Sequence, residues 1–289
     1  MHPTLNLRPV LSPESMQARP TLRFQILAVE VMEGKTPTFD IGDREALVLD
    51  ASFPEIDENV HPMRRATETC EVFVFGVSQA GHSVVARVAG FMPHFYVELS
   101  RVVTIDVIKK AVGEIRRKYG LPQSAIRVAL EDRRRAYGWV PAPDNTHKVA
   151  TFQFACLKFH NSWLLRNVAY KFSEKATDIV ALRCLTETPD VSEERVAVSE
   201  KFLAAHNLKP SGWCQIQACS YDIVLSTART TVSQVEIRTC TGVPKPLERA
   251  SIAPLVIAAV DIEAHSHDFR SFPDATVPGD KITFIGTTF

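Results

Sequence analysis

The stretch IAPLVIAAVDIE, residues 252–263, combines a β-branched apolar run with two carboxylates that are separated by one residue. Positions i and i+2 of a β-strand point to the same face, so Asp261 and Glu263 are expected to project together from the end of a buried strand. A second apolar segment, ITFI at residues 282–285, follows after a loop and ends at Gly286. The pattern predicts two hairpin-like strands with an acid pair on the first. The spacing alone is more typical of two solvated carboxylates at a strand end, because D-x-E is a common pattern.

The composition is that of a globular protein, with 45% hydrophobic and 23% charged residues. A chain of 289 residues can form one large domain or two ordinary ones and can bury a sizeable core. The formal net charge is zero, so contacts with nucleic acid must come from local patches. No apolar run approaches the ~20 residues of a membrane helix, and no partner membrane is expected. Residues 1–21 lack the apolar core of a signal peptide and are expected to be a disordered lead-in.

The six cysteines do not form any CxxC pair, and most lie in apolar runs that are typical of strands. We therefore expect buried, reduced thiols in an intracellular protein. The histidines also lack the spacing of zinc ligands, so no zinc site is expected.

Periodicity predicts an α/β (α+β) chain. Strands are expected at residues 22–32, 44–50, 70–77, 83–88, 94–99, 125–130, 151–159, 213–219, 221–227 and 232–238. Helices are expected at residues 104–119, from 161 or 162 to about 172, and 191–206. Thr104 is the expected N-cap of the first helix, and Lys109 and Lys110 lie away from its apolar stripe. The strand and helix at 151–172 repeat the order of those at 95–119, which predicts a repeated βα element.

Two further segments bear on function. Arg133, Arg134 and Arg135 follow a predicted strand and could contact phosphates. A run of this kind is more often solvated or paired with adjacent acids, here Glu131 and Asp132. The segment TGVPKPLERA, residues 241–250, has two prolines and no apolar period, which favours a domain boundary there. Residues 251–289 are too few for an independent core, and the end directly after a strand indicates truncation.

The segments in this order resemble the family B DNA polymerases, most of all the delta-type eukaryotic enzymes and those of large DNA viruses. The stretch 252–263 is similar to the entry to their 3′→5′ exonuclease domain, and FPDA (272–275) with DKITFIG (280–286) resembles the following loop and second strand. Upstream, FGV (75–77), GHSV (81–84), GFMPHFYV (90–97) and SGWC (211–214) are similar to N-terminal segments of the family. Ala264 departs from the cysteine that relatives often carry.

The resemblance implies a β-rich, OB-like N-terminal polymerase domain at residues 22–250, followed by the first strands of a ribonuclease H-like exonuclease domain at 251–289. It implies that Asp261 and Glu263 are catalytic metal ligands for Mg²⁺ or Mn²⁺, within a two-metal site that hydrolyses phosphodiester bonds during proofreading. The other acids of that site and the polymerase active site would lie past Phe289. The 289 residues by themselves are therefore expected neither to polymerise nor to proofread.

The resemblance further implies template–primer DNA and single-stranded DNA as partners, and a sliding clamp and accessory subunits for a full-length protein. It implies a place in the nucleus or at a viral replication site in the host cell. Candidate DNA contacts are Arg133, Arg134, Arg135, Lys109 and Lys110, with Tyr137 or Trp139 as possible stacking partners of an unpaired base. The alternative is a non-catalytic module that binds single-stranded nucleic acid. An isolated nuclease and a plain interaction domain are two further alternatives.

Overall fold

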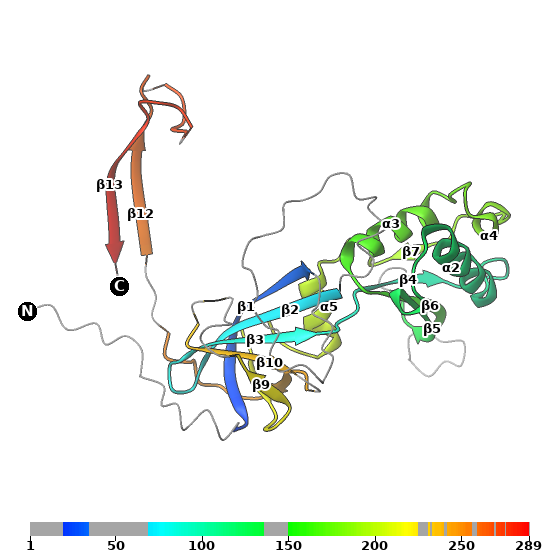
Figure 1. Ribbon diagram of the computed structural model, residues 1–289, viewed down its shortest axis with the longest axis horizontal. Helices are drawn as coiled ribbons and strands as arrows, with labels where there is room; N and C mark the ends of the chain where they lie inside the picture. The colour runs from blue at the N-terminus through cyan, green and yellow to red at the C-terminus, as the bar shows by residue number, and fades with distance from the viewer. Residues whose placement is uncertain are drawn as a thin grey trace, which may run out of the picture.

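The computed structural model describes residues 20–34, 69–135, 150–224, 231, 233–239, 242–255, 259–268, 270–274 and 276–288. Figure 1 shows a large sheet, a smaller sheet covered by helices, and a two-stranded hairpin that extends away from both. The predicted strand at 44–50 lies outside the described residues. Within the described part of the chain, no helix is long and apolar enough to cross a membrane.

The larger sheet has the strand order β11-β8-β1-β2-β3-β10-β9, and its neighbours are antiparallel except for the parallel pair β3 and β10. Its strands are β1 (Leu22–Gly34), β2 (Thr69–Ser78), β3 (Ser83–Ala89), β8 (Trp213–Ile216), β9 (Tyr221–Ile223), β10 (Val235–Thr239) and β11 (Lys245–Leu247). One face carries a core that includes Phe24, Val72, Val84 and Ile237, together with Phe202 of helix α5 (Val198–Ala205). The β-rich character predicted for the N-terminal region is confirmed.

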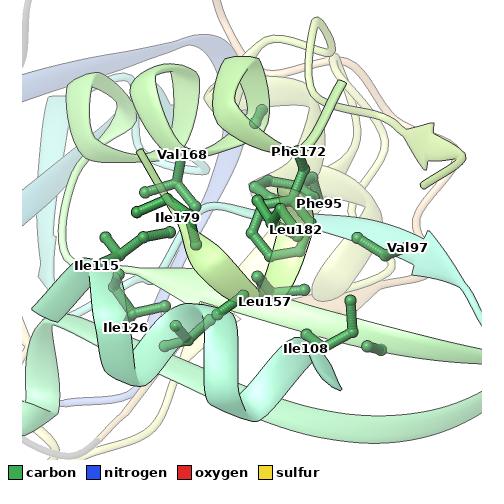
Figure 2. Close-up of a cluster of buried hydrophobic side chains, with 14 of the residues drawn as sticks. Phe95, Val97, Ile108, Ile115, Ile126, Leu157, Val168, Phe172, Ile179 and Leu182 are labelled. Atoms are coloured by element: carbon green, nitrogen blue, oxygen red, sulfur yellow. The ribbon is translucent and has the colours of Figure 1, made fainter. Parts of the chain in front are cut away.

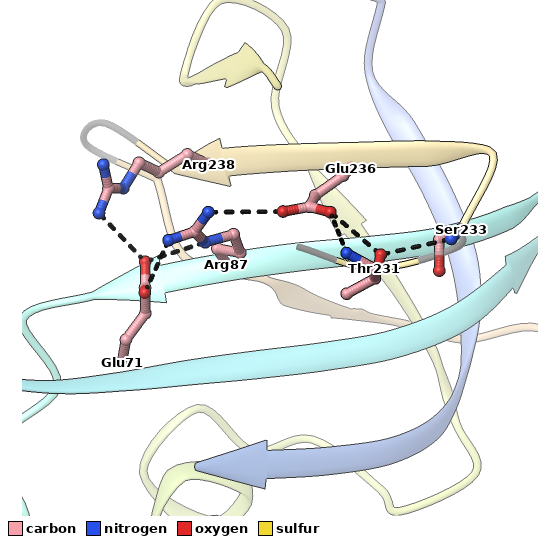
Figure 3. A network of polar contacts seen from close by, with 6 residues as sticks. All are labelled: Glu71, Arg87, Thr231, Ser233, Glu236 and Arg238. Carbon is pink, nitrogen blue, oxygen red and sulfur yellow. Dashed lines mark hydrogen bonds and ion pairs between the residues drawn. The ribbon is translucent and has the colours of Figure 1, made fainter. Parts of the chain in front are cut away.

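The opposite face of the same strands carries a charged network (Figure 3). Arg87 pairs with Glu71 at 3.0 Å and with Glu236 at 3.4 Å, and Arg238 pairs with Glu71 at 3.3 Å. The fully buried Glu236 also accepts hydrogen bonds from the backbone N–H and the hydroxyl of Thr231. Two carboxylates thus face two guanidinium groups, which compensates the desolvation that a lone buried charge would suffer.

The smaller sheet has the order β5-β6-β4-β7, and all neighbours are antiparallel. Its elements in chain order are β4 (His94–Glu98), α2 (Ile105–Tyr119), the 3-10 turn η2 (Gln123–Ala125), β5 (Ile126–Arg133), β6 (Phe152–Phe159), α3 (Ser162–Ser173), α4 (Val180–Arg183) and β7 (Val191–Ser192). The order βαββαβ is a split βαβ arrangement. The repeated βα element expected from the sequence is confirmed.

Alternate residues of β4 and β6 build the core beneath the helices (Figure 2). Phe95 and Leu157 point from the sheet toward Ile108 and Ile115 of α2 and toward Phe172 of α3. The helices begin where the sequence predicts, because the Thr104 side chain accepts from the N–H of Val107 and the Asn161 side chain accepts from that of Leu164.

The predicted helix at 191–206 is wrong at its N-terminal half. Val191 and Ser192 form β7, which pairs with Val97 and Tyr96 of β4. Glu193 follows with a φ of 67°, a left-handed conformation that an α-helix cannot continue. The helix α5 therefore starts only at Val198. Pairing with β4 therefore outweighs the local helix propensity of residues 191–192. The short helix α4 was not predicted from the sequence.

The proline-bearing segment 241–250 remains attached to the larger sheet, since β11 pairs with β8. The attachment continues past residue 250. The indole N–H of Trp213 donates to the carbonyl of Ser251 at 2.6 Å, and the N–H of Ala253 donates to the Gln25 side chain at 2.7 Å. The domain boundary between residues 250 and 251 stays a prediction. Among the five described cysteines, Cys70, Cys156 and Cys214 are buried and Cys184 and Cys219 are exposed.

Asp178 joins the two long helices of the smaller sheet. Its Oδ2 accepts from Lys118 Nζ at 2.7 Å, from Lys171 Nζ at 2.9 Å and from the Tyr119 hydroxyl at 3.2 Å. Lys118 and Tyr119 end α2, and Lys171 lies in the last turn of α3. The hydrogen bond from Lys118, together with that from Lys171, holds the pKa of Asp178 well below its ordinary value.

We predict that Asp178→Asn lowers the free energy of unfolding at pH 7 by about 1 kcal/mol, the scale of a surface charge network. Because the folded pKa is depressed, the stabilisation is present above the unfolded pKa of about 3.9 and is lost as the pH falls toward the folded pKa. The difference between the two proteins in urea unfolding should therefore shrink progressively as the pH falls below about 4.

The matched control is Asp132→Asn, which removes an exposed carboxylate from β5 and should change the stability little. A difference between wild type and Asp178→Asn that stayed constant down to pH 2 would contradict an ionic origin.

Candidate functional site

Asp261 and Glu263 lie on β12 (Ala259–His265), which forms an antiparallel hairpin with β13 (Lys281–Thr288). Asp261 pairs across the ladder with Gly286, and Glu263 pairs with Phe284. Residues directly opposite each other share a face, so both carboxylates stand on one face of the hairpin, and both are exposed. The predicted strand, acid spacing and second strand are all present.

The other face of the hairpin is apolar and is also open to solvent. The solvent-exposed fractions of Val260, Ile262 and Ile285 are 61%, 54% and 58%. An isolated two-stranded hairpin is marginally stable in water, and exposed β-branched residues favour burial against a further surface. One face of the hairpin therefore has the apolar residues that could pack against a hydrophobic core, and the other face carries the two carboxylates.

The surroundings of the acid pair suit a hard cation. Carboxylate oxygens are preferred ligands of Mg²⁺ and Mn²⁺. Gly286 leaves the position opposite Asp261 without a side chain, and a Cβ added there would lie 3.2 Å from the Phe284 ring. The described residues contain no cluster of three or more His, Cys, Asp or Glu side chains that could hold a metal. The donor chemistry of the two carboxylates therefore fits Mg²⁺ or Mn²⁺.

The aspartates of the loop between β12 and β13 serve a different purpose. Asp268 accepts from the backbone N–H groups of Arg270 and Ser271. Asp280 accepts from the N–H of Asp274 and that of His267, which lowers its pKa, and its Oδ1 lies 3.0 Å from Nδ1 of His267. These contacts order the loop, as expected for loop residues outside a metal site.

The three consecutive arginines lie at the end of β5. Arg133 pairs with Glu131 at 2.7 Å, and its guanidinium lies 4.7 Å from the centre of the Tyr96 ring. Arg135 pairs with Glu98 through Nε at 2.9 Å and lies 4.0 Å from the centre of the Phe152 ring. The pairing of Arg133 with an adjacent acid is the alternative that the sequence left open.

Lys109 and Lys110 do not share a surface with the arginines. Both are exposed on α2, and α2 packs on the face of the smaller sheet that carries Phe95 and Leu157. The Arg133 guanidinium covers the Tyr96 ring. Tyr96 points away from the helices, because its neighbour in the strand, Phe95, points toward them. The five predicted DNA contacts thus divide between opposite faces of one sheet. Tyr137 and Trp139 lie outside the described residues.

One feature was missed from the sequence. Tyr96, Phe154 and Cys156 form a separate cluster on the outer face of the smaller sheet, with Phe152 packed against it. Burial raises the pKa of the Cys156 thiol to about 12. The signal was the alternation in FQFACLKF, residues 152–159. Each alternating set contains three apolar residues and one polar residue, so the pattern does not show which set faces the helices.

Several known proteins are similar to this chain over much of its length. A family model described as DNA polymerase family B, exonuclease domain, matches residues 190–289. The DNA polymerase of Acanthamoeba polyphaga mimivirus is 23% identical over 263 residues, which cover 82% of this chain. The DNA polymerase of Paramecium bursaria Chlorella virus NY2A is 25% identical over 216 residues, which cover 75% of this chain.

A solved structure shows the same fold. The family B DNA polymerase from the hyperthermophilic archaeon Pyrobaculum calidifontis matches 92% of this chain with a TM-score of 0.52 and 13% identity. The family model and the viral relatives support a fragment of a family B DNA polymerase. It spans only 13% and 21% of the length of the two viral polymerases, and 25% of the archaeal chain. The segment that matches the exonuclease domain contains the β12–β13 hairpin.

We predict that the hairpin of the 289-residue chain exchanges its amide hydrogens quickly. Nothing described covers either of its faces, so its ladder bonds should open with a free energy of about 1 kcal/mol or less. The amides of Val72 and Val74 in β2, which has a strand on each side, provide the internal control. Hydrogen exchange followed by mass spectrometry should resolve the two regions. Equal protection of both would show that a further surface covers the hairpin.

Proposed function

We propose that this chain is part of a replicative DNA-directed DNA polymerase and joins an N-terminal domain to a 3′→5′ proofreading exonuclease. The observation that carries the proposal is the position of Asp261 and Glu263 on one face of β12, inside the segment that matches the exonuclease domain. In this proposal residues 22–250 form the N-terminal domain and residues 251–289 begin the exonuclease domain.

Asp261 and Glu263 would hold Mg²⁺ or Mn²⁺ together with acids from outside these 289 residues. Such metals, when bound, activate a water nucleophile and stabilise the leaving oxygen of a phosphodiester. The role of the chain itself is to fix the two carboxylates at the separation set by one strand. Gly286 contributes by keeping the neighbouring position open.

The partners follow from the same proposal. Template–primer DNA and the single-stranded primer end are the substrates, and a sliding clamp and accessory subunits are expected partners of the complete polymerase. Replication would take place in the nucleus or at a viral replication site. The viral relatives support this setting, because they are named DNA polymerases. They do not favour the alternative of a non-catalytic binding module.

The proposal predicts weak Mn²⁺ binding by the 289-residue chain through the acid pair. Two exposed carboxylates without further ligands should give a dissociation constant of about 1 mM. Titration followed by the electron paramagnetic resonance signal of free Mn²⁺ measures it directly. Asp261→Asn should weaken this binding at least several-fold, because a neutral amide replaces one of two charged ligands.

Asp274→Asn is the matched control, since it removes a carboxylate from the loop of the same hairpin. Asp274 accepts hydrogen bonds from the N–H and hydroxyl of Thr276, and its loss should leave Mn²⁺ binding unchanged. Equal weakening by both substitutions, or none by either, would contradict the assigned role of the acid pair.

A further inference from the structure

The segment that leads into β12 is held on the outer face of the larger sheet. Trp213 of β8 pairs across the ladders with Gln25 of β1 on one side and with Leu247 of β11 on the other. Residues opposite one another share a face, and the adjacent residues Phe24 and Cys214 point into the core. Trp213 and Gln25 therefore present their side chains on the face that lies away from this core.

Two hydrogen bonds fasten the backbone of the segment to these side chains. The indole N–H of Trp213 donates to the carbonyl of Ser251 at 2.6 Å. Oε1 of Gln25 accepts from the N–H of Ala253 at 2.7 Å, while Nε2 of Gln25 donates to the carbonyl of Ser211 at 3.0 Å. Trp213 and Ala253 are both buried. The segment is thereby attached through its main chain as far as Ala253.

Arg249 adds a third attachment from the segment itself. Its guanidinium lies 4.5 Å from the centre of the Trp213 ring. Its Nε donates to the Ser251 hydroxyl at 2.6 Å, and its Nη1 donates to the Gln79 side chain at 2.8 Å. Gln79 lies in the turn between β2 and β3, so the segment contacts three separate parts of the sheet. Gln25, Gln79, Trp213 and Arg249 together form a linker clamp.

The linker clamp limits where the acid pair can lie. The hairpin begins at Ala259, and the chain from Ala253 to Ala259 reaches about 20 Å at most. Without the linker clamp, the last residue paired with the sheet would be Leu247. The chain from Leu247 to Ala259 reaches about 40 Å. Release of the linker clamp therefore doubles the length of the tether.

The length of the tether decides how closely the hairpin stays with the rest of the molecule. The effective concentration of a group on a flexible linker falls roughly as the −3/2 power of the linker length, so a doubled tether lowers it about three-fold. A catalytic group also acts only when it is held in a defined position relative to its substrate. A short tether thus favours the acid pair as a catalytic group.

We propose that Gln25, Trp213 and Arg249 are positioning residues for the acid pair. They hold residues 249–253 on the larger sheet and so fix the point from which the β12–β13 hairpin starts. They act through the chain that joins Ala253 to β12, not through contact with a substrate. This role rests on the proposed function, because it assumes that the acid pair belongs to an exonuclease. The attachment itself does not depend on that function.

Distance measurement by pulsed electron paramagnetic resonance tests this role in the 289-residue chain. Nitroxides on genetically encoded keto residues replace Arg23 and Val260, which are both exposed, so the native thiols stay unlabelled. Gln25→Met/Trp213→Phe/Arg249→Ala should widen the distribution of label separations and extend it by up to about 20 Å, because the tether doubles in length. Gln25→Met alone should extend it less, because the indole hydrogen bond remains.

Gln153→Met is the matched control, since it makes the same replacement at an exposed glutamine of β6 in the smaller sheet. It should leave the label separations unchanged. Amide exchange of Val72 and Val74 in β2 reports whether the larger sheet of each variant is folded. Unchanged separations in the folded triple variant, or equal widening in Gln153→Met, would overturn the proposal.

A second readout needs no label. The Ala253 amide lies outside the strands but donates to Gln25, so it should be protected from hydrogen exchange in the wild-type protein. Gln25→Met should speed its exchange, measured by NMR, at least about ten-fold. Gln25→Glu keeps an oxygen that accepts from Ala253 and should restore the protection. An unprotected Ala253 amide in the wild-type protein would also overturn the proposal.

The linker clamp and the proposed function fail separately. The distances and the exchange rates are measured in EDTA, so neither requires metal binding. A held segment in a chain that binds no Mn²⁺ would support the linker clamp and contradict the proposed function. Mn²⁺ binding that Asp261→Asn weakens, in a chain whose label separations do not respond to the triple substitution, would contradict the linker clamp alone.

Discussion

The two-residue period of β-strands is the constraint on which this molecule depends most. In β2, β3 and β10 this period places Val72, Val84 and Ile237 in the core. Residues on the other face of the same strands form the charge-balanced network of Glu71, Arg87, Glu236 and Arg238. In β4 and β6 it sends one set of residues beneath the helices and an aromatic set to the other face. In β12 it places two carboxylates together. Each sheet thus has one face for packing and another for polar or aromatic chemistry.

Much of this arrangement could be predicted from the residues. Thr104 and Asn161 mark helix starts because their side chains accept from backbone N–H groups within the first turn. The D-x-E spacing of Asp261 and Glu263 needs no tertiary information, since the geometry of one strand fixes it. The acid pair, the hairpin and the repeated βα element were therefore accessible from sequence.

Other features depend on contacts between distant segments, which local patterns do not encode. Val191 and Ser192 become a strand because β4 offers a free edge, and Lys201 is buried because two carbonyls from separate segments receive it. Arg135 finds Glu98 at a separation of 37 residues. The aromatic face could not be identified because Cys156 and Leu157, which point to opposite faces of β6, are both apolar.

The hairpin links the architecture to the family. Its apolar face remains open in the described structure, while the matched family segment ends on it. An amphipathic strand pair of this kind is suited to form the edge of a larger core, with its carboxylates directed to solvent and substrate. The physical pattern and the family match therefore support the same assignment for Asp261 and Glu263.

The most direct measurement of that assignment is the position of a bound metal. Crystals of the protein soaked in Mn²⁺ would locate it through anomalous scattering. The account predicts a peak about 2.1 Å from a carboxylate oxygen of Asp261, with Glu263 in contact directly or through water. A peak at the loop aspartates Asp274 and Asp280, with none beside Asp261, would contradict it.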